Sequence, residues 1–246
     1  MLLTDFRTRP VGDSALTVEF EKKIDPEVNA MVHALRALLV EECVPGITDM
    51  IPTFCSLLIC YDPGTIRYDA LCREIRRISA NSSCRASHSP RTFLIPVCYG
   101  GEYGEDLPYV AEHAGISERE VIRRHSAPDY LIYMLGFLPG FSYLGGMDPV
   151  LETPRLSQPR QRIPAGSVGI GGNQTGLYPL DSPGGWRLIG RSPIRPYDPR
   201  KSEPILYRAG DRIRFVPIRE KEYREIEEAV EKGVYECPYL EGGRRR

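Results

Sequence analysis

The chain has 246 residues, of which 41% are hydrophobic and 26% are charged, and its formal net charge at pH 7 is −1. These totals are typical of a globular protein with a core, and they include no basic excess that would favour nucleic acid as a partner. Its longest apolar runs, such as residues 57–61, are too short to cross a membrane, and the first residues lack the apolar core of a signal peptide. We therefore expect a cytoplasmic protein that does not associate with membranes.

The seven cysteines and four histidines do not have the spacing of a metal site. The number of cysteines is odd and no two of them form a Cys-x-x-Cys pair, so we expect free buried thiols and no bound metal.

The first third of the chain alternates strand and helix patterns. Apolar residues at every second position predict a strand over 14–20, and Asp25 followed by Pro26 predicts the start of a helix. Strands over 47–51 and 54–61 and a helix through Leu71, Ile75 and Ile78 follow. The order strand, helix, strand, strand, helix predicts a small ferredoxin-like α/β domain.

A polar, serine-rich segment over 81–90 predicts the domain boundary. We expect an N-terminal domain over 1–88, a second domain over 89–218, and a C-terminal helix and tail over 219–246. Within the second domain, Ser117 and Glu120 predict a capping box at the start of a short helix. The other predicted elements are short strands, typical of a barrel or sandwich, over 93–99, 130–135, 167–170, 177–180, 186–190 and 212–216.

Glycine and proline are concentrated in residues 135–196, together with aromatic side chains. Alternating these residues gives rigid loops with exposed backbone amides. Between residues 136 and 196 six arginines outnumber three carboxylates, and guanidinium groups beside backbone amides favour a site for phosphate or carboxylate. The alternative is that each arginine only braces a loop. The arginines are Arg155, Arg160, Arg162, Arg187, Arg191 and Arg195.

The segment over 169–176 does not match a nucleotide-binding loop, because it lacks the lysine of a P-loop and the last glycine of the dinucleotide motif. We interpret it as a tight turn that displays Asn173, Gln174 and Thr175. His125 ends the capped helix, where it either stabilises the helix terminus or takes part in proton transfer or phosphate binding beside Tyr130. Trp186 is interpreted more readily as a core residue than as a stacking platform.

Several long motifs resemble the family formed by the B subunit of 5-oxoprolinase, which is also labelled allophanate hydrolase subunit 1 or sporulation kinase A inhibitor. They are YMLGFLPGFSYLGGMD over 133–148, PRQRIPAGSV over 159–168, QTGLYP over 174–179 and SPGGWRLIGRSP over 182–193, supported by VGDSAL over 11–16, PVCYGG over 96–101 and GDRIRF over 210–215. The resemblance therefore extends over nearly the whole chain.

The resemblance implies an α+β protein, with a small ferredoxin-like N-terminal domain followed by a cyclophilin-like β-barrel. It also implies a hydrolase component that uses ATP with Mg²⁺, acts on a small-molecule substrate, and works with two partners, a barrel protein like the C subunit of 5-oxoprolinase and a protein like its A subunit. Together they would open 5-oxoproline to glutamate, and the complex could hold the ATP outside this chain. Carried over by motif, the expected catalytic residues are His125, Arg162 and Arg191, and the expected substrate- or nucleotide-binding residues are Arg160, Ser167, Gln174, Thr175 and Ser182.

Two other functions remain open at this point. The inhibitor label implies a regulatory protein that blocks the autophosphorylation of a histidine kinase. The allophanate label implies a carboxyltransferase-like component of a urea or allophanate pathway.

Overall fold

The computed structural model describes residues 3–80, 90–241 and 244–245. The chain divides into two compact units, Met1–Ser89 and Pro90–Arg246. The expected boundary at residues 88 and 89 lies outside the described residues. No helix in the described parts of the chain is long and apolar enough to span a membrane.

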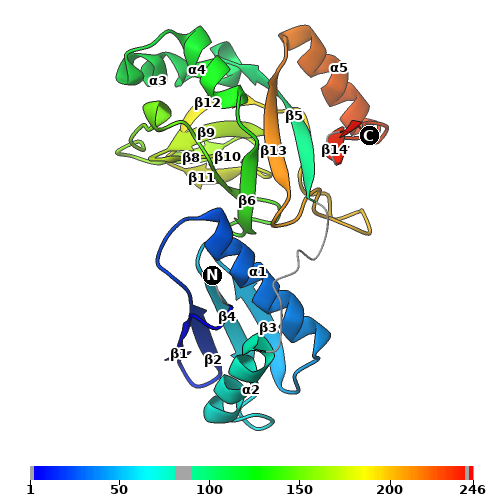
Figure 1. Cartoon of the computed structure of the whole chain (residues 1–246). Coiled ribbons are helices and arrows are strands. Elements are labelled where there is room, and N and C mark those ends of the chain that lie inside the picture. The colour runs from blue at the N-terminus through cyan, green and yellow to red at the C-terminus, as the bar shows by residue number, and fades with distance from the viewer. Residues whose placement is uncertain (1–2, 81–89, 242–243, 246) are drawn as a thin grey trace. The chain divides into compact units, whose positions relative to one another are not determined.

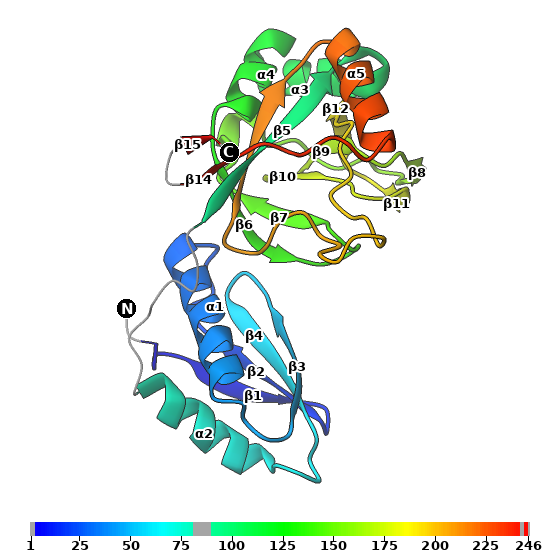
Figure 2. The same ribbon diagram turned by 90° about the vertical axis from the view of Figure 1, so that its right-hand side faces the viewer.

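The first unit is a four-stranded antiparallel sheet with its helices on one face (Figures 1 and 2). Its elements are β1 (Arg7–Val11), β2 (Ala15–Glu19), α1 (Pro26–Glu41), β3 (Ile47–Pro52), β4 (Ser56–Tyr61) and α2 (Tyr68–Ala80). The Asp25 side chain accepts a hydrogen bond of 2.9 Å from the backbone N–H of Glu27, which confirms the predicted start of α1.

The strand order β1-β2-β4-β3 is that of a ferredoxin-like sheet, with one difference. The edge position beside β2, which a strand after α2 would normally take, is filled by β1. The sequence did not indicate β1 as a strand, because it contains Pro10 and is mostly exposed. Both features are tolerated at a sheet edge, where one side of the strand needs no backbone partner.

The second unit is built around a nearly closed sheet. Its path runs β10-β9-β12-β5-β13-β6-β7, and β14 also pairs with β5. A separate two-stranded sheet pairs β11 with β8. The strands are β5 (Arg91–Tyr99), β6 (Tyr130–Leu135), β7 (Ser142–Gly145), β8 (Arg160–Ile163), β9 (Ser167–Gly171), β10 (Gln174–Leu177), β11 (Ser182–Gly184), β12 (Arg187–Arg191), β13 (Arg212–Pro217) and β14 (Tyr239–Glu241).

Three longer helices accompany this sheet: α3 (Leu107–Ala114), α4 (Glu118–Ser126) and α5 (Glu220–Glu231). In Figure 1 the helices α3 and α4 lie together over one end of the barrel. The capping box is half confirmed. Ser117 Oγ accepts from the N–H of Glu120, but the Glu120 carboxylate pairs with Arg123 and Arg124. The C-terminal segment belongs to the second unit, since β14 pairs with β5.

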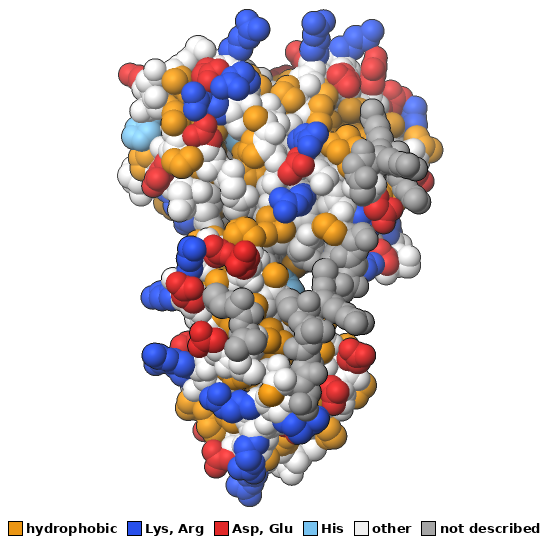
Figure 3. Space-filling view, viewed as in Figure 1, with side chains coloured by type: hydrophobic (Ala, Val, Ile, Leu, Met, Phe, Trp, Pro, Cys, Tyr) orange, Lys and Arg blue, Asp and Glu red, His pale blue; other side chains and the backbone are white. Residues whose placement is uncertain are grey.

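The barrel interior contains fully buried aliphatic and aromatic residues, among them Ile95, Tyr130, Val168 and Ile213. A separate cluster, formed by Phe141, Ile163, Tyr178, Trp186 and Leu188, packs beside this core. The six described cysteines are free thiols, but only Cys98 is buried, so the expectation of buried thiols holds for that residue alone. On the face shown in Figure 3, basic and acidic side chains are interspersed, in keeping with the net charge of −1.

Candidate functional site

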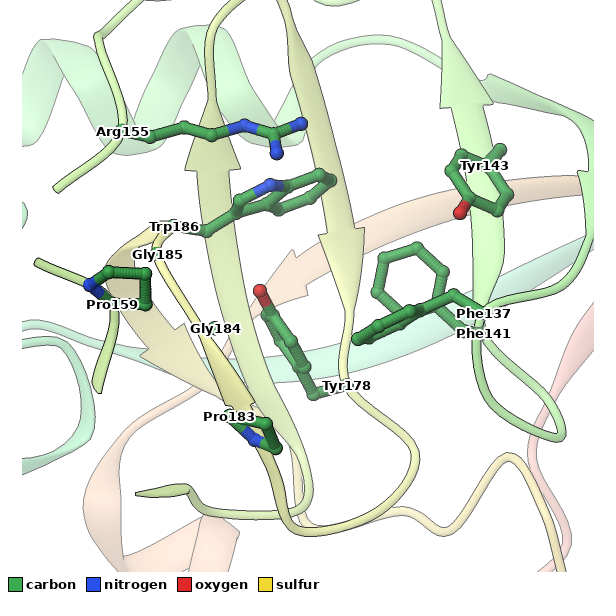
Figure 4. Close-up of a pocket in the computed structure, with 10 residues that line it drawn as sticks. All are labelled: Phe137, Phe141, Tyr143, Arg155, Pro159, Tyr178, Pro183, Gly184, Gly185 and Trp186. Atoms are coloured by element: carbon green, nitrogen blue, oxygen red, sulfur yellow. The ribbon is translucent and has the colours of Figure 1, made fainter. Parts of the chain in front are cut away.

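A pocket of about 310 Å³ opens beside the separate aromatic cluster of the second unit. We call it the aromatic pocket. Figure 4 shows its lining, in which β7, β11 and the loops that flank β8, β10 and β12 contribute side chains. The lining residues are Phe137, Phe141, Tyr143, Arg155, Pro159, Tyr178, Pro183, Gly184, Gly185 and Trp186.

The glycines around this pocket allow aromatic rings to lie directly against the backbone. A Cβ atom on Gly171 would lie 2.4 Å from the Trp186 indole, and one on Gly184 would lie 2.9 Å from Tyr178 Oη. At Gly176 the corresponding distance to Trp186 is 3.1 Å. Real Cβ atoms do not approach other atoms as closely as the first two distances require, so a side chain at either position would force its neighbours to move, and at Gly171 that neighbour is the rigid indole. The glycine-rich pattern therefore has a packing role here, which differs from the predicted display of backbone amides.

The aromatic walls hold each other in edge-to-face contact. The ring of Phe141 lies 5.8 Å from Trp186 and 5.5 Å from Tyr178, and Tyr178 lies 6.0 Å from Trp186, with interplanar angles between 70° and 82°. These are favourable geometries for aromatic pairs, each contributing about 0.5–1.5 kcal/mol beyond the area that it buries. The walls are thus formed before any ligand arrives.

Polar groups also line this apolar surface, among them Arg155 and Tyr178. The guanidinium of Arg155 lies over the Trp186 ring at 5.8 Å from its centroid, and Figure 4 shows it above the indole. Burial raises the pKa of Tyr178 to about 12, so its hydroxyl keeps its proton at neutral pH. Among the lining residues Arg155 is the one with a charged side chain. The pocket therefore offers flat apolar walls, the hydroxyls of Tyr143 and Tyr178, and one positive charge.

One loop beside the pocket is conformationally strained. Phe137 has a φ of 66° although it is not glycine, and 61% of the residue is exposed. Such a conformation costs about 1–3 kcal/mol and persists only where the surrounding structure holds it. The loop is closed by hydrogen bonds from the N–H of Gly136 to Phe141 O and from the N–H of Phe141 to Leu138 O.

His125 lies inside the barrel and away from the aromatic pocket. It is fully buried, and its nitrogens lie 2.7 Å from Tyr99 Oη and 2.7 Å from Thr175 Oγ1. Thr175 Oγ1 donates to Gly169 O, so it accepts from His125 Nε2–H, and Nδ1 accepts from the Tyr99 hydroxyl. Burial lowers the pKa of His125 to about 3, so the ring is neutral. The ring therefore links α4 to β5 and β10 through these two hydrogen bonds. Because the ring is neutral, it does not stabilise the end of α4 as a cation.

The predicted arginines do not converge on one cavity. Arg160 pairs with Asp106 at 2.9 Å and donates to Trp186 O at 3.2 Å, so it fixes the backbone that carries the indole. Arg187 also pairs with Asp106, at 3.5 Å. Arg162 is 77% exposed and pairs with Asp181 at 2.7 Å.

Arg191 lies near this last pair. A hydrogen bond from the N–H of Ala165, the Arg162 guanidinium and the charge of Arg191 together lower the pKa of Asp181. Arg162 therefore pairs with Asp181, and Arg191 influences the same carboxylate only through its charge, outside the aromatic pocket. The arginines therefore do not form one shared site for phosphate or carboxylate, because Arg160 and Arg187 pair with Asp106 whereas Arg162 pairs with Asp181.

The predicted binding residues lie at separate places. Ser167 and Ser182 are buried, and within the described structure their hydroxyls have no hydrogen-bond partner. Ser167 is paired with Arg191 across β9 and β12. Gln174 starts β10 and is half-buried. Thr175 was expected at an exposed turn, but it is 1% exposed and bonds to His125, so its predicted display is wrong.

The sequence did not indicate the aromatic pocket. It also did not indicate that Arg155, unlike the other arginines of this segment, lines that pocket. Trp186 was interpreted as a core residue, and it is 6% exposed, yet it also forms a pocket wall. One available signal was the density of aromatic residues in the motifs that contain Phe137, Phe141 and Tyr178.

The chain matches known families along most of its length. A family model described as "Carboxyltransferase domain, subdomain C and D" matches residues 6–207. The B subunit of 5-oxoprolinase from Bacillus subtilis (strain 168) is 42% identical over 233 residues, covering 91% of this chain and 97% of that protein. A protein of the same name from Escherichia coli O157:H7 is 42% identical, covering 85% and 95%. The chain belongs to the 5-oxoprolinase B-subunit family. The resemblance seen in the motifs is therefore confirmed.

The fold of this family member also recurs in a larger protein. The crystal structure of the Kluyveromyces lactis urea amidolyase matches 98% of this chain, and 16% of that chain, with a TM-score of 0.81 and 20% identity. At this identity the match shows the shared fold alone. The predicted α+β fold, a small α/β part followed by a barrel, is confirmed.

ATP with Mg²⁺ is a poor fit to the described residues. Mg²⁺ prefers oxygen ligands such as carboxylates, and a triphosphate needs several positive groups. Across residues 3–80 and 90–241, no group of three or more His, Cys, Asp or Glu side chains is placed to hold a metal ion. The aromatic pocket provides one cation and no carboxylate. We therefore derive no chemical step through nucleotide within this chain.

Proposed function

We propose that this chain is one component of a heteromeric, ATP-dependent 5-oxoprolinase, which opens 5-oxoproline to glutamate in the cytoplasm. The observation that carries the proposal is the 42% identity to the B subunit of the Bacillus subtilis 5-oxoprolinase across 97% of that protein. Similarity of this extent includes both units of the fold, so it is not restricted to a common scaffold.

The chemistry explains why ATP is needed. The lactam is stabilised by resonance, so its carbonyl carbon is a poor electrophile. Transfer of the γ-phosphoryl group to the lactam oxygen gives ADP and an activated carbon. Water would then add to that carbon, and cleavage of the C–N bond with protonation of the nitrogen would give an acyl phosphate of glutamate. A second water would hydrolyse this acyl phosphate to glutamate and phosphate. Positioned cations and amides stabilise the charge that develops during such transfers.

The chain needs partners in this proposal. Because the pocket residues do not fit ATP with Mg²⁺, we assign the nucleotide to the assembled complex, formed with a barrel protein like the C subunit and a protein like the A subunit. Alone, the chain would be inactive. Arg162, Arg191 and His125 remain predicted catalytic residues. Arg162, exposed beside Asp181, is the one of the three most open to contact with another protein of the complex.

The proposal is tested by mixing the purified chain with the products of its neighbouring genes. We expect 5-oxoproline and ATP to be consumed together, and both to be left untouched when this chain is omitted. Tight binding to a sensor kinase, with no consumption of either compound, would favour the regulatory function. ATP consumption that depends on urea and a biotin carrier would favour the carboxyltransferase function.

A further inference from the structure

The aromatic pocket has one charged lining residue, and that residue lacks a protein counter-ion. Arg155 forms no ion pair with any carboxylate in the described part of the chain, whereas Arg160 and Arg187 share Asp106 and Arg162 pairs with Asp181. Arg155 instead lies over the Trp186 ring, at the pocket. We infer that the aromatic pocket binds 5-oxoproline, with its ring against Trp186 and Phe141 and its carboxylate on Arg155. This inference rests on the proposed function.

The walls suit a small ring with aliphatic carbons. Phe141, Tyr178 and Trp186 line the pocket and meet edge to face, so its walls are aromatic surface that suits contact with CH groups. A pocket of about 310 Å³ is at the lower end of the range for small-molecule sites. Because the walls are already packed against each other, little ordering is needed when the ligand binds.

The lactam has a polar partner in the same pocket. Tyr178 lines the pocket, and within the described structure its hydroxyl makes no hydrogen bond to another protein group. Since its pKa is raised, the hydroxyl stays protonated and can donate to the lactam carbonyl. Arg155 can bind the carboxylate through two N–H groups, a geometry that guanidinium and carboxylate share.

The charge of the pocket lining also argues against nucleotide binding there. A triphosphate carries several negative charges, and the lining offers a single guanidinium. A ligand with one carboxylate matches that charge. The ligand class is therefore a small, monoanionic lactam ring.

Trp186 is the only tryptophan in the chain, so its fluorescence reports directly on occupancy of the pocket. We would titrate the full chain with three probes: 5-oxoproline, 2-pyrrolidinone, which lacks the carboxylate, and cyclopentanecarboxylate, which lacks the lactam. We expect millimolar 5-oxoproline to change the Trp186 emission in a saturable way. The other two probes should bind more weakly, and ATP should neither change the emission nor compete.

Two variants separate the two polar contacts. Arg155→Met should weaken binding of 5-oxoproline and cyclopentanecarboxylate about tenfold and leave 2-pyrrolidinone unchanged, since it removes the charged partner alone. Tyr178→Phe should weaken the two lactams and leave cyclopentanecarboxylate unchanged. The matched control is Arg208→Met, which removes an exposed arginine that pairs with Glu203 outside the pocket.

Three results would overturn the inference. They are an emission that does not respond to 5-oxoproline, a loss of affinity in Arg155→Met that is the same for all three probes, and displacement of 5-oxoproline by ATP. The assembled complex separates this inference from the proposed function. If the complex hydrolyses 5-oxoproline and Arg155→Met leaves its KM unchanged, the function stands and the pocket assignment fails. If the chain binds 5-oxoproline and the complex does not hydrolyse it, the proposed function fails.

Discussion

Replacing Gly171 with alanine tests the packing that forms the aromatic pocket. The new Cβ would lie 2.4 Å from Cδ1 and Nε1 of Trp186 and 2.7 Å from Cε2. The indole is rigid, and it is held by Phe141 and Tyr178, so it cannot move away without disturbing both rings. Overpacking of this kind destabilises a protein by about 1–3 kcal/mol. We expect Gly171→Ala to lose stability in that range and to shift the Trp186 emission.

The assay is denaturant unfolding, followed both by circular dichroism and by Trp186 fluorescence. Gly185→Ala is the matched control, because it adjoins the same tryptophan, lines the same pocket, and would place its Cβ no closer than 3.7 Å to any atom. We expect the control to stay within about 0.5 kcal/mol of the wild type. A Gly171→Ala variant that is as stable as Gly185→Ala and keeps the wild-type emission spectrum would refute the packing role of Gly171.

Three further predictions concern the stability of the folded protein. His125 is neutral when folded, with a pKa lowered to about 3, so stability is full above pH 6.5 and declines as pH falls below it; unfolding at pH 6.5 and 5 should differ by about 2 kcal/mol, and His125→Gln should remove that difference. Asp106→Ala leaves the buried N–H of Leu188 without its acceptor and removes one of the two carboxylates that pair with Arg160, and calorimetry should show a loss of about 1–3 kcal/mol. Asp25→Ala removes the cap of α1, and denaturant unfolding should show a loss of about 1 kcal/mol.

The first unit was largely predictable because its signals are local. The cap at Asp25 and the alternation of Leu16 and Val18 depend on neighbours a few residues away. The edge strand β1 was missed because an edge position tolerates proline and exposure, and the sequence alone does not show which strand lies at an edge.

The site was less predictable because its decisive contacts join distant residues. Arg160 and Asp106 are 54 residues apart, and His125 and Thr175 are 50 apart, so sequence patterns around each do not reveal the pairing. For the same reason the sequence did not show that the Trp186 indole packs against Gly171, in the space that a side chain would otherwise fill. The arginine excess was read correctly as a charge pattern, yet only the fold shows that Arg160 and Arg187 pair with Asp106, that Arg162 pairs with Asp181, and that Arg155 is the arginine that lines the aromatic pocket.

The most direct test of ligand binding in the aromatic pocket is a crystal structure of the full chain with 5-oxoproline. We predict ligand density in this pocket, with the lactam ring against Trp186 and Phe141 and the carboxylate within hydrogen-bond distance of Arg155. Density for 5-oxoproline beside Arg162 and Arg191, with the aromatic pocket empty, would contradict the assignment.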